Sequence, residues 1–204
     1  NVQKAWGMFA MSHMDADIDR WADNPNEPSL AEMTSKALEI LSQNQNGFFI
    51  MIEASQVDWA GHQNDPVWMI TDFLAFDAAL QVALDFAMTN GDTMVISFPD
   101  HDTGSMSIAH EQGPGIPKYT GISIEAMIDP IKDATVSLDS LMDKVIEAGG
   151  TLEALRSTMA AYWGEWWADP ENMSDDQAYE LLFIWYTAGN YAGAQYLSSE
   201  LTGF

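Results

Sequence analysis

Two short apolar runs dominate the hydrophobic pattern of the chain, and each gives way abruptly to acidic residues and a histidine. The first run covers residues 48–52 (FFIMI) and the second covers residues 93–98 (TMVISF). Runs of this length, rich in β-branched and aromatic residues, are typical of strands that are buried on both faces. We therefore predict a buried strand at each run. The apolar residues 5–9 are compatible with a further short strand or its end.

Apolar residues at helical spacing predict a helix before each of these strands. Ser29 forms a capping box with Glu32, which favours a helix over residues 30–43. A longer helix is expected over residues 66–89, whereas the polar, proline-containing residues 12–28 are typical of a loop. The order helix, strand, helix, strand fits parallel βαβ connections. The pattern thus predicts an α/β fold, with part of a parallel-rich sheet and flanking helices.

The second half of the chain has a different pattern. A loop is expected at residues 112–117, followed by a mostly helical region. Its helices are predicted over residues 138–148, 152–163, 175–188 and 189–204, and Ser174 and Gln177 form a capping box for the third of them. Aromatic residues gather here, either as core or as an inter-subunit contact: Tyr162, Trp163, Trp166, Trp167, Tyr179, Phe183, Trp185 and Tyr186.

Charge and composition narrow the classes of function. The chain has 31 acidic and 7 basic residues among 204, for a formal net charge of −24. Such a surface repels nucleic acids and anionic membranes, and it is typical of proteins kept soluble in salty or cold surroundings. No apolar run approaches the roughly 20 residues of a membrane span. The absence of cysteine excludes disulfides and thiolate metal sites.

Candidate chemistry follows directly after the two apolar runs. Glu53, Asp58 and His62 come after the first run, and Asp100 and His101 come after the second. Ligands bind at the carboxyl ends of parallel strands, so the two clusters are expected to meet there. A carboxylate at the end of a buried strand is costly unless a cation compensates it. Since Lys and Arg are absent from residues 47–62, we predict bound metal ions.

The ligand types indicate which metals would bind. Oxygen and imidazole ligands without sulfur suit zinc or a similar divalent ion, whereas an all-oxygen site around Glu53 suits magnesium. Asp58 and His62, four residues apart, can converge within one helical turn. Two clusters at adjacent strand ends predict a two-metal site, with ions about 3.5–4 Å apart, of the kind that clamps both oxygens in a phosphoryl transfer.

Several segments resemble the alkaline phosphatase family. They are GFFIMIEASQVDWAGH (47–62), FLAFDAALQVALDFA (73–87) and PDHDTGSM (99–106), preceded by GMFAMSHMDADIDR (7–20) and PSLAEMTSKALEIL (28–41). The resemblance extends from about Trp6 to Ile108. It implies that residues 1–108 are the central metal-binding part of an alkaline phosphatase-like α/β domain. It also implies that residues 109–204 are a mostly helical, crown-like insertion.

The resemblance also implies a role for each candidate residue. Glu53 is similar to the family's magnesium ligand, Asp58 and His62 to the ligands of one zinc, and Asp100 and His101 to the ligands of a second zinc.

Three other residues stand apart from this set. Trp59 occupies a position where some family members have Lys or His, so it either lies near the phosphate site or packs as a structural aromatic. His13 and His110 match no ligand position.

Parts of the family pattern have no counterpart in this sequence. The nucleophilic serine, an aspartate between the metals and a phosphate-binding arginine belong to the family's N-terminal half. A last zinc histidine belongs to a C-terminal motif, and no histidine follows His110. The one Asp-Ser pair, Asp139 and Ser140, falls in the predicted helical region. The expectation is the middle of a longer enzyme, with the nucleophilic Ser upstream, so that these 204 residues alone are inactive.

Two functional hypotheses follow. The first is a metal-dependent phosphatase that hydrolyses phosphate monoesters through two zinc ions, one magnesium ion and a phosphoserine intermediate. The second is a catalytically inactive, phosphatase-like fragment that serves assembly or protein interaction. The resemblance implies a phosphate monoester substrate, the remainder of the same enzyme and a second copy in a homodimer as partners. It also implies a periplasmic or extracellular location.

Overall fold

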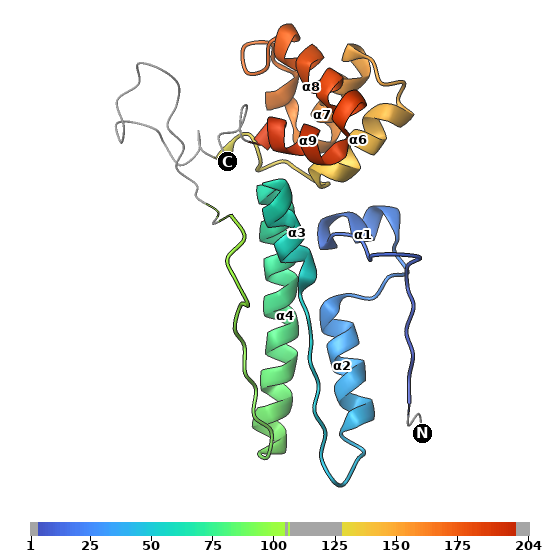
Figure 1. Ribbon diagram of the computed structural model, residues 1–204, viewed down its shortest axis with the longest axis vertical. Coiled ribbons are helices and arrows are strands. Elements are labelled where there is room, and N and C mark those ends of the chain that lie inside the picture. The colour runs from blue at the N-terminus through green and yellow to red at the C-terminus, as the bar shows by residue number, and fades with distance from the viewer. Residues whose placement is uncertain (1–3, 105, 107–127, 199–204) are drawn as a thin grey trace, which may run out of the picture. The chain divides into compact units, whose positions relative to one another are not determined.

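The computed structural model describes residues 4–104, 106 and 128–198 (Figure 1). Its elements in chain order are α1 (Asp17–Asp23), α2 (Leu30–Leu41), α3 (Ser55–Gln63), α4 (Pro66–Asn90), α6 (Leu138–Glu147), α7 (Leu152–Trp163), the 3-10 turn η1 (Glu165–Ala168), α8 (Asp175–Ala188) and α9 (Asn190–Tyr196). The predicted loop 112–117, His110 and the predicted domain boundary at residue 108 lie outside the described residues.

The contacts between residues divide the chain into two units. The first unit takes the described residues of Asn1–Asp58 and Ile70–Asp102, and the second takes those of Trp59–Met69 and Thr103–Phe204. The division falls inside α3 and inside α4. The candidate residues Glu53, Asp58, Asp100 and His101 thus belong to the first unit, whereas Trp59 and His62 belong to the second.

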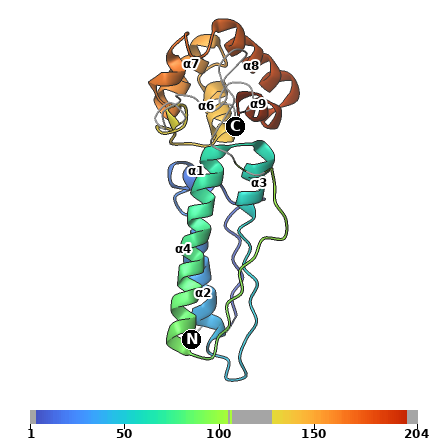
Figure 2. The ribbon, with the colours of Figure 1, turned by 90° about the vertical axis from the view of Figure 1, so that its left-hand side faces the viewer.

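The predicted parallel-rich sheet is wrong for the part of the chain that the structure describes, which contains no strand. Residues 48–52 and 93–98 are extended, but neither forms a ladder of hydrogen bonds (Figure 2). Most of their apolar side chains are exposed, with 89% of Phe49 and 76% of Phe98 accessible, and the others are only partly buried. An extended segment becomes a strand only when an adjacent chain pairs with its N–H and C=O groups. The apolar runs predicted the extension but not a pairing partner.

Most helices were predicted correctly, because their signals are local. The capping boxes at Ser29 and Ser174 are both formed, and α2, α4, α6, α7 and α8 match the predicted ranges within a few residues. The prediction of a loop throughout residues 12–28 was wrong, since α1 lies within it. No side chain caps α1 at Ala16, and Arg20 is bonded to Asp17 and to the carbonyl of Glu27 instead. Without a cap, this short helix has no clear sequence signal.

The helix α4 is long and apolar enough to cross a membrane by length and composition, although no run of the sequence suggested a span. This is weak support for a span, because core helices of soluble proteins meet the same criterion. The helix also carries acidic residues. One of them, Asp72, is buried within the first unit and accepts a hydrogen bond from α1.

The side chain of Asp72 joins α1 to α4 within the first unit. The backbone N–H of Asp17 donates a hydrogen bond of 3.0 Å to Asp72 Oδ2, and Asp72 is only 7% exposed. Burial raises the pKa of Asp72 to about 7. The carboxylates of Asp17 and Asp19 add to the rise, while the Asp17 N–H and the charge of Arg20 oppose it. The folded chain therefore holds a proton here that the unfolded chain releases at lower pH.

We expect the Asp72→Asn variant to be more stable than the parent chain at pH 8. Between the ordinary pKa of 3.8 and about 7, the folded state binds more protons than the unfolded state, so the free energy of unfolding falls as the pH rises. Asparagine keeps an acceptor for the Asp17 N–H but carries no charge. The gain should be about 2–4 kcal/mol at pH 8 and vanish below pH 4, measured by urea unfolding across this range.

The matched control is Asp77→Asn, at an exposed position of the same helix, which should change the free energy of unfolding by no more than about 0.5 kcal/mol at either pH. A variant at Asp72 that is less stable than the parent at pH 8 would contradict the assignment of the raised pKa.

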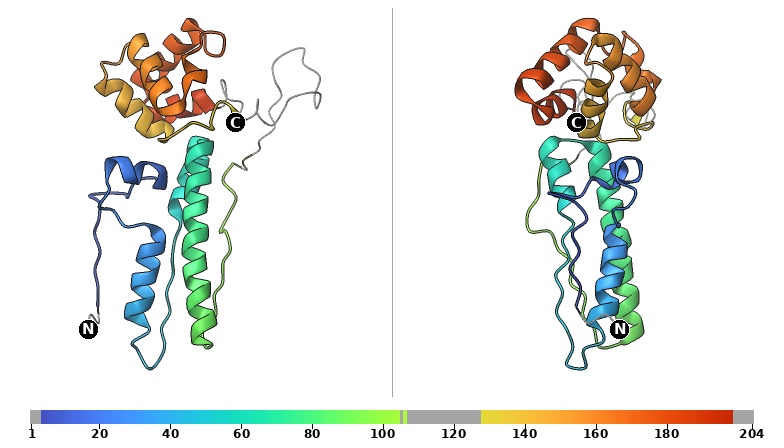
Figure 3. Two further views of the ribbon diagram at one scale, coloured as in Figure 1. Left: turned by 180° about the vertical axis from the view of Figure 1, so that it is seen from behind. Right: turned by 90° about the vertical axis from the view of Figure 1, so that its right-hand side faces the viewer.

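The core of the second unit forms where α6, α7, α8 and α9 pack together (Figure 3). Trp163 and Trp167 are fully buried, and their indole N–H groups donate to the carbonyls of Val136 (2.9 Å) and Pro130 (2.6 Å). Trp185 is also buried. The core interpretation of the aromatic residues is confirmed for these three. Others of the group are exposed on α8, namely Tyr179, Phe183 and Tyr186.

Candidate metal centre

The helix α3 carries three of the candidate residues. It begins two residues after Glu53, with Asp58 in its first turn and His62 in its last turn. A spacing of four residues places Asp58 and His62 on the same side of the helix. Trp59 follows Asp58 and is partly buried. The arrangement expected from the sequence for Asp58 and His62 is therefore present in the backbone.

The imidazole of His101 lies between the carboxylates of Asp58 and Asp100 within the first unit. His101 Nδ1 lies 3.9 Å from Asp58 Oδ1, and His101 Nε2 lies 3.6 Å from Asp100 Oδ2. All three side chains are accessible, with 57% of the His101 side chain and 87% of the Asp100 side chain exposed. Asp58 and His101, 43 positions apart in sequence, thus lie close together in the first unit.

The structure does not bring the whole predicted ligand set together. In residues 4–104, 106 and 128–198, no group of three or more carboxylate or imidazole side chains is arranged to hold a metal ion. Glu53 is exposed near the end of the first extended segment, and His62 is exposed on the last turn of α3. The assignment of these residues to zinc and magnesium stays a prediction.

A glycine on α3 allows the chain that follows His101 to approach this helix. A Cβ atom built on Gly61 would lie 2.5 Å from the carbonyl oxygen of Thr103, closer than real Cβ atoms approach. Because the obstructing atom belongs to the backbone, a side chain at position 61 would displace residue 103 itself. Gly61 is thus required for the close packing of the Thr103 segment on α3.

Asp65 begins α4 and also contacts α6. Its Oδ1 accepts hydrogen bonds of 3.0 Å from the N–H groups of Val67 and Trp68. Its Oδ2 accepts a bond of 2.7 Å from the N–H of Leu138. No local pattern indicates a bond between positions 73 residues apart.

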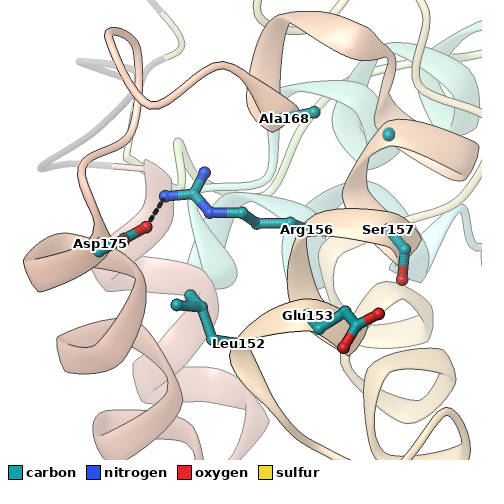
Figure 4. A pocket seen from close by; sticks show the side chains of 7 residues that line it. Leu152, Glu153, Arg156, Ser157, Ala168 and Asp175 are labelled. Carbon is teal, nitrogen blue, oxygen red and sulfur yellow. Dashed lines mark hydrogen bonds and ion pairs between the residues drawn. The ribbon is translucent and has the colours of Figure 1, made fainter.

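A hollow on the surface of the second unit lies away from the candidate residues in sequence (Figure 4). Its lining consists of Leu152, Glu153, Arg156, Ser157, Ala160, Ala168 and Asp175. The guanidinium of Arg156 donates to Asp175 Oδ1 at 2.7 Å and to the carbonyl of Met173 at 2.8 Å, as Figure 4 shows for Asp175. Because Asp175 neutralises this cation, the hollow does not resemble a phosphate site.

The family model and two relatives that match this sequence are alkaline phosphatases. The family model for alkaline phosphatase matches residues 1–133. Alkaline phosphatase 3 of Bacillus subtilis (strain 168) is 36% identical over 151 residues, which is 74% of this chain and 30% of that protein. Alkaline phosphatase of Escherichia coli (strain K12) is 39% identical over 94 residues, which is 46% of this chain and 20% of that protein. The chain thus spans less than a third of these relatives.

A solved structure supports the same relationship at the level of the fold. The cold-active alkaline phosphatase from the psychrophile Shewanella sp. aligns with a TM-score of 0.64 at 23% identity, over 88% of this chain and 41% of that one. The family match covers more than half of the 204 residues and includes all of the candidate metal ligands. The chain therefore belongs to the alkaline phosphatase family.

Proposed function

We propose that a full-length protein carrying this chain is a metal-dependent phosphatase that hydrolyses phosphate monoesters. The observation that carries the proposal is the family match over residues 1–133, which contains both ligand-bearing segments. In the proposal, two zinc ions and one magnesium ion serve the reaction, and a serine outside these 204 residues forms a phosphoserine intermediate. Because the matched relatives are more than three times as long as the matched region, their activity enters here as a proposal.

The available donors fit these metals. Asp58 and His62 would hold one zinc ion, Asp100 and His101 the other, and Glu53 the magnesium ion. Carboxylate and imidazole without thiolate suit zinc, and a lone carboxylate with water suits magnesium. The separation of 3.9 Å between Asp58 Oδ1 and His101 Nδ1 supports the proposal, because adjoining metal sites require their ligands to be close.

The charge of the chain favours bound cations as part of this function. With a net charge of −24, the protein repels a phosphate dianion over most of its surface. When bound, the metal ions supply positive charge next to the attacking and leaving oxygens of the phosphoryl group. In the proposal, the chain holds the carboxylates and imidazoles in place, and Trp59, which follows Asp58 on α3, lies near the phosphate site.

The expected partners and location are part of the proposal. Family resemblance supports a homodimer and a periplasmic or extracellular location. The exposed aromatic side chains of Tyr179, Phe183 and Tyr186 on α8 supply apolar surface that such a contact would cover.

Metal removal tests the proposed function. The full-length protein should hydrolyse p-nitrophenyl phosphate, lose this activity on dialysis against EDTA, and regain it when zinc and magnesium are added together. Metal analysis before and after dialysis verifies the removal, and mass spectrometry after acid quenching should detect phosphoserine. Residues 1–204 alone should be inactive in the same assay.

Two control substrates separate this function from related ones. Bis(p-nitrophenyl) phosphate and p-nitrophenyl sulfate should be hydrolysed far more slowly than the monoester. A protein that keeps its activity after verified metal removal would refute the metal assignment. A full-length protein with zinc bound but no monoester hydrolysis would favour the inactive, assembly-type alternative.

A further inference from the structure

The short corner between α3 and α4, residues 62–65, is bonded along its whole length to the helical part of the second unit. The carbonyl of His62 accepts a bond of 3.3 Å from Gln195 Nε2, and the carbonyl of Asn64 accepts a bond from the hydroxyl of Ser198. Both donors lie at or just beyond α9. These contacts reach the corner from residues more than 130 positions away in sequence.

Two further bonds connect the corner to α6. The side chain of Gln63 is hydrogen-bonded to the carboxylate of Asp139, a partly buried group whose pKa burial raises. Asp65 Oδ2 accepts a bond from the N–H of Leu138, the first residue of α6. Each of the four corner residues is thus bonded to the helical part of the second unit.

The carboxylate of Asp65 is the central group of this arrangement. It is fully buried, and N–H groups at the first turns of α4 and α6 donate to it. Buried carboxylates are stable only when such donors surround them, and helix N-termini favour negative charge. One carboxylate therefore fixes the start of α4 against the start of α6. Asn64, just before it, has a left-handed backbone with φ of 56°, so the tertiary contacts also set the local conformation.

We infer that Asp65 is a positioning residue for His62. The inference rests on the proposed function, because it treats His62 as a zinc ligand. His62 is three residues from Asp65 and on the last turn of α3, so the bonds at the corner determine where its backbone lies. Metal ligands must be held within about 0.5 Å of their working geometry by the residues that support them. The helices α6 and α9 therefore act as a frame for the ligand-bearing end of α3.

The Asp65→Asn variant tests this role. Asparagine keeps one oxygen to accept from the N–H groups of α4, but its NH₂ group meets the N–H of Leu138, so the bond to α6 is lost. We expect the zinc dissociation constant of the full-length holoenzyme to rise about tenfold, at the low end of the effect of removing groups that support metal ligands. Competition with a chromophoric zinc chelator measures this constant without any assay of activity. At saturating zinc, kcat and KM should return to the parent values.

Ser174→Ala provides a destabilising control elsewhere in the second unit. It removes the cap of α8, where Ser174 Oγ accepts from the N–H of Gln177, and touches no residue of the corner. Its zinc dissociation constant should equal that of the parent protein. If Ser174→Ala weakens zinc binding as much as Asp65→Asn does, the effect comes from lost stability and the inference is overturned.

A second variant keeps the inference testable if Asp65→Asn does not fold. Ser198→Ala removes only the hydroxyl that donates to the carbonyl of Asn64, and it should raise the zinc dissociation constant in the same direction. An unchanged constant in a folded Ser198→Ala protein, or in a folded Asp65→Asn protein, overturns the inference.

His62→Ala separates failure of the inference from failure of the proposed function. If His62→Ala keeps the parent zinc content and activity, His62 is no ligand, and the proposed zinc site fails together with the inference. If His62→Ala loses zinc while Asp65→Asn binds zinc as the parent does, the proposed function stands and the positioning role alone fails.

Discussion

Replacing His101 with alanine is expected to lower kcat/KM for p-nitrophenyl phosphate by about a thousandfold or more in the full-length protein. The reason is the position of its imidazole, which lies 3.9 Å from Asp58 Oδ1 and 3.6 Å from Asp100 Oδ2. Loss of His101 removes a proposed zinc ligand that lies close to Asp58 and Asp100. Steady-state kinetics at fixed zinc and magnesium concentrations, with metal analysis of the purified variant, measure the effect.

The second variant and the control for this prediction use the same assay. Asp58→Ala should cause a loss of similar size, and the double variant Asp58→Ala/His101→Ala should lose little more than either single variant, because the groups act as one unit. His13→Ala, at an exposed position that matches no ligand, should retain the parent activity. Near-parent activity of His101→Ala would exclude His101 from the metal centre.

Replacing Trp163 with alanine is expected to destabilise the second unit by about 3–5 kcal/mol, the usual cost of truncating a fully buried aromatic residue. Trp163 has no exposed surface, lies with its ring centroid 6.3 Å from that of Trp167, and donates to the carbonyl of Val136. Truncation leaves a cavity and an unpaired carbonyl. Urea unfolding followed by circular dichroism at 222 nm measures the change in the free energy of unfolding.

Two further variants separate the causes of this loss. Trp163→Phe keeps much of the ring volume but loses the indole N–H, so it should cost about 1–3 kcal/mol, as expected for a buried acceptor left without its donor. Ile146→Ala, at an exposed position of α6, should change stability by no more than about 0.5 kcal/mol. Equal effects of Trp163→Ala and Ile146→Ala would show that the tryptophan does not lie in the core.

The elements that could be predicted from the sequence are those whose causes are local. The capping box of Ser29 and Glu32 involves four consecutive residues, so the start of α2 followed from the sequence. Strand pairing depends on residues elsewhere, and the apolar runs at 48–52 and 93–98 therefore predicted an extended backbone but wrongly predicted a sheet. The helix α1 was missed for a related reason, since Arg20 supports it instead of a cap.

At the candidate site, too, local features could be predicted from the sequence, whereas contacts between distant residues could not. From the sequence we predicted that Asp58 and His62 share one helical turn and that the Asp100 and His101 pair lies close to Asp58. In the structure, Asp58 and His62 both lie on α3, and His101 lies near Asp58. The metal assignments themselves stay a prediction, because they came from resemblance. The hydrogen bond from the N–H of Leu138 to Asp65 could not be predicted, because no pattern near either residue indicates a contact between positions 73 residues apart.

The bond between Asp65 and Leu138 has a consequence for how this region tolerates change. The donor is a peptide N–H, which every amino acid except proline provides. Side-chain substitutions at Leu138 therefore need not break this bond, as long as the first turn of α6 keeps its register, whereas the bond between Gln63 and Asp139 depends on the side chain at position 139. Insertions or deletions just before Leu138 are the changes that this architecture should exclude.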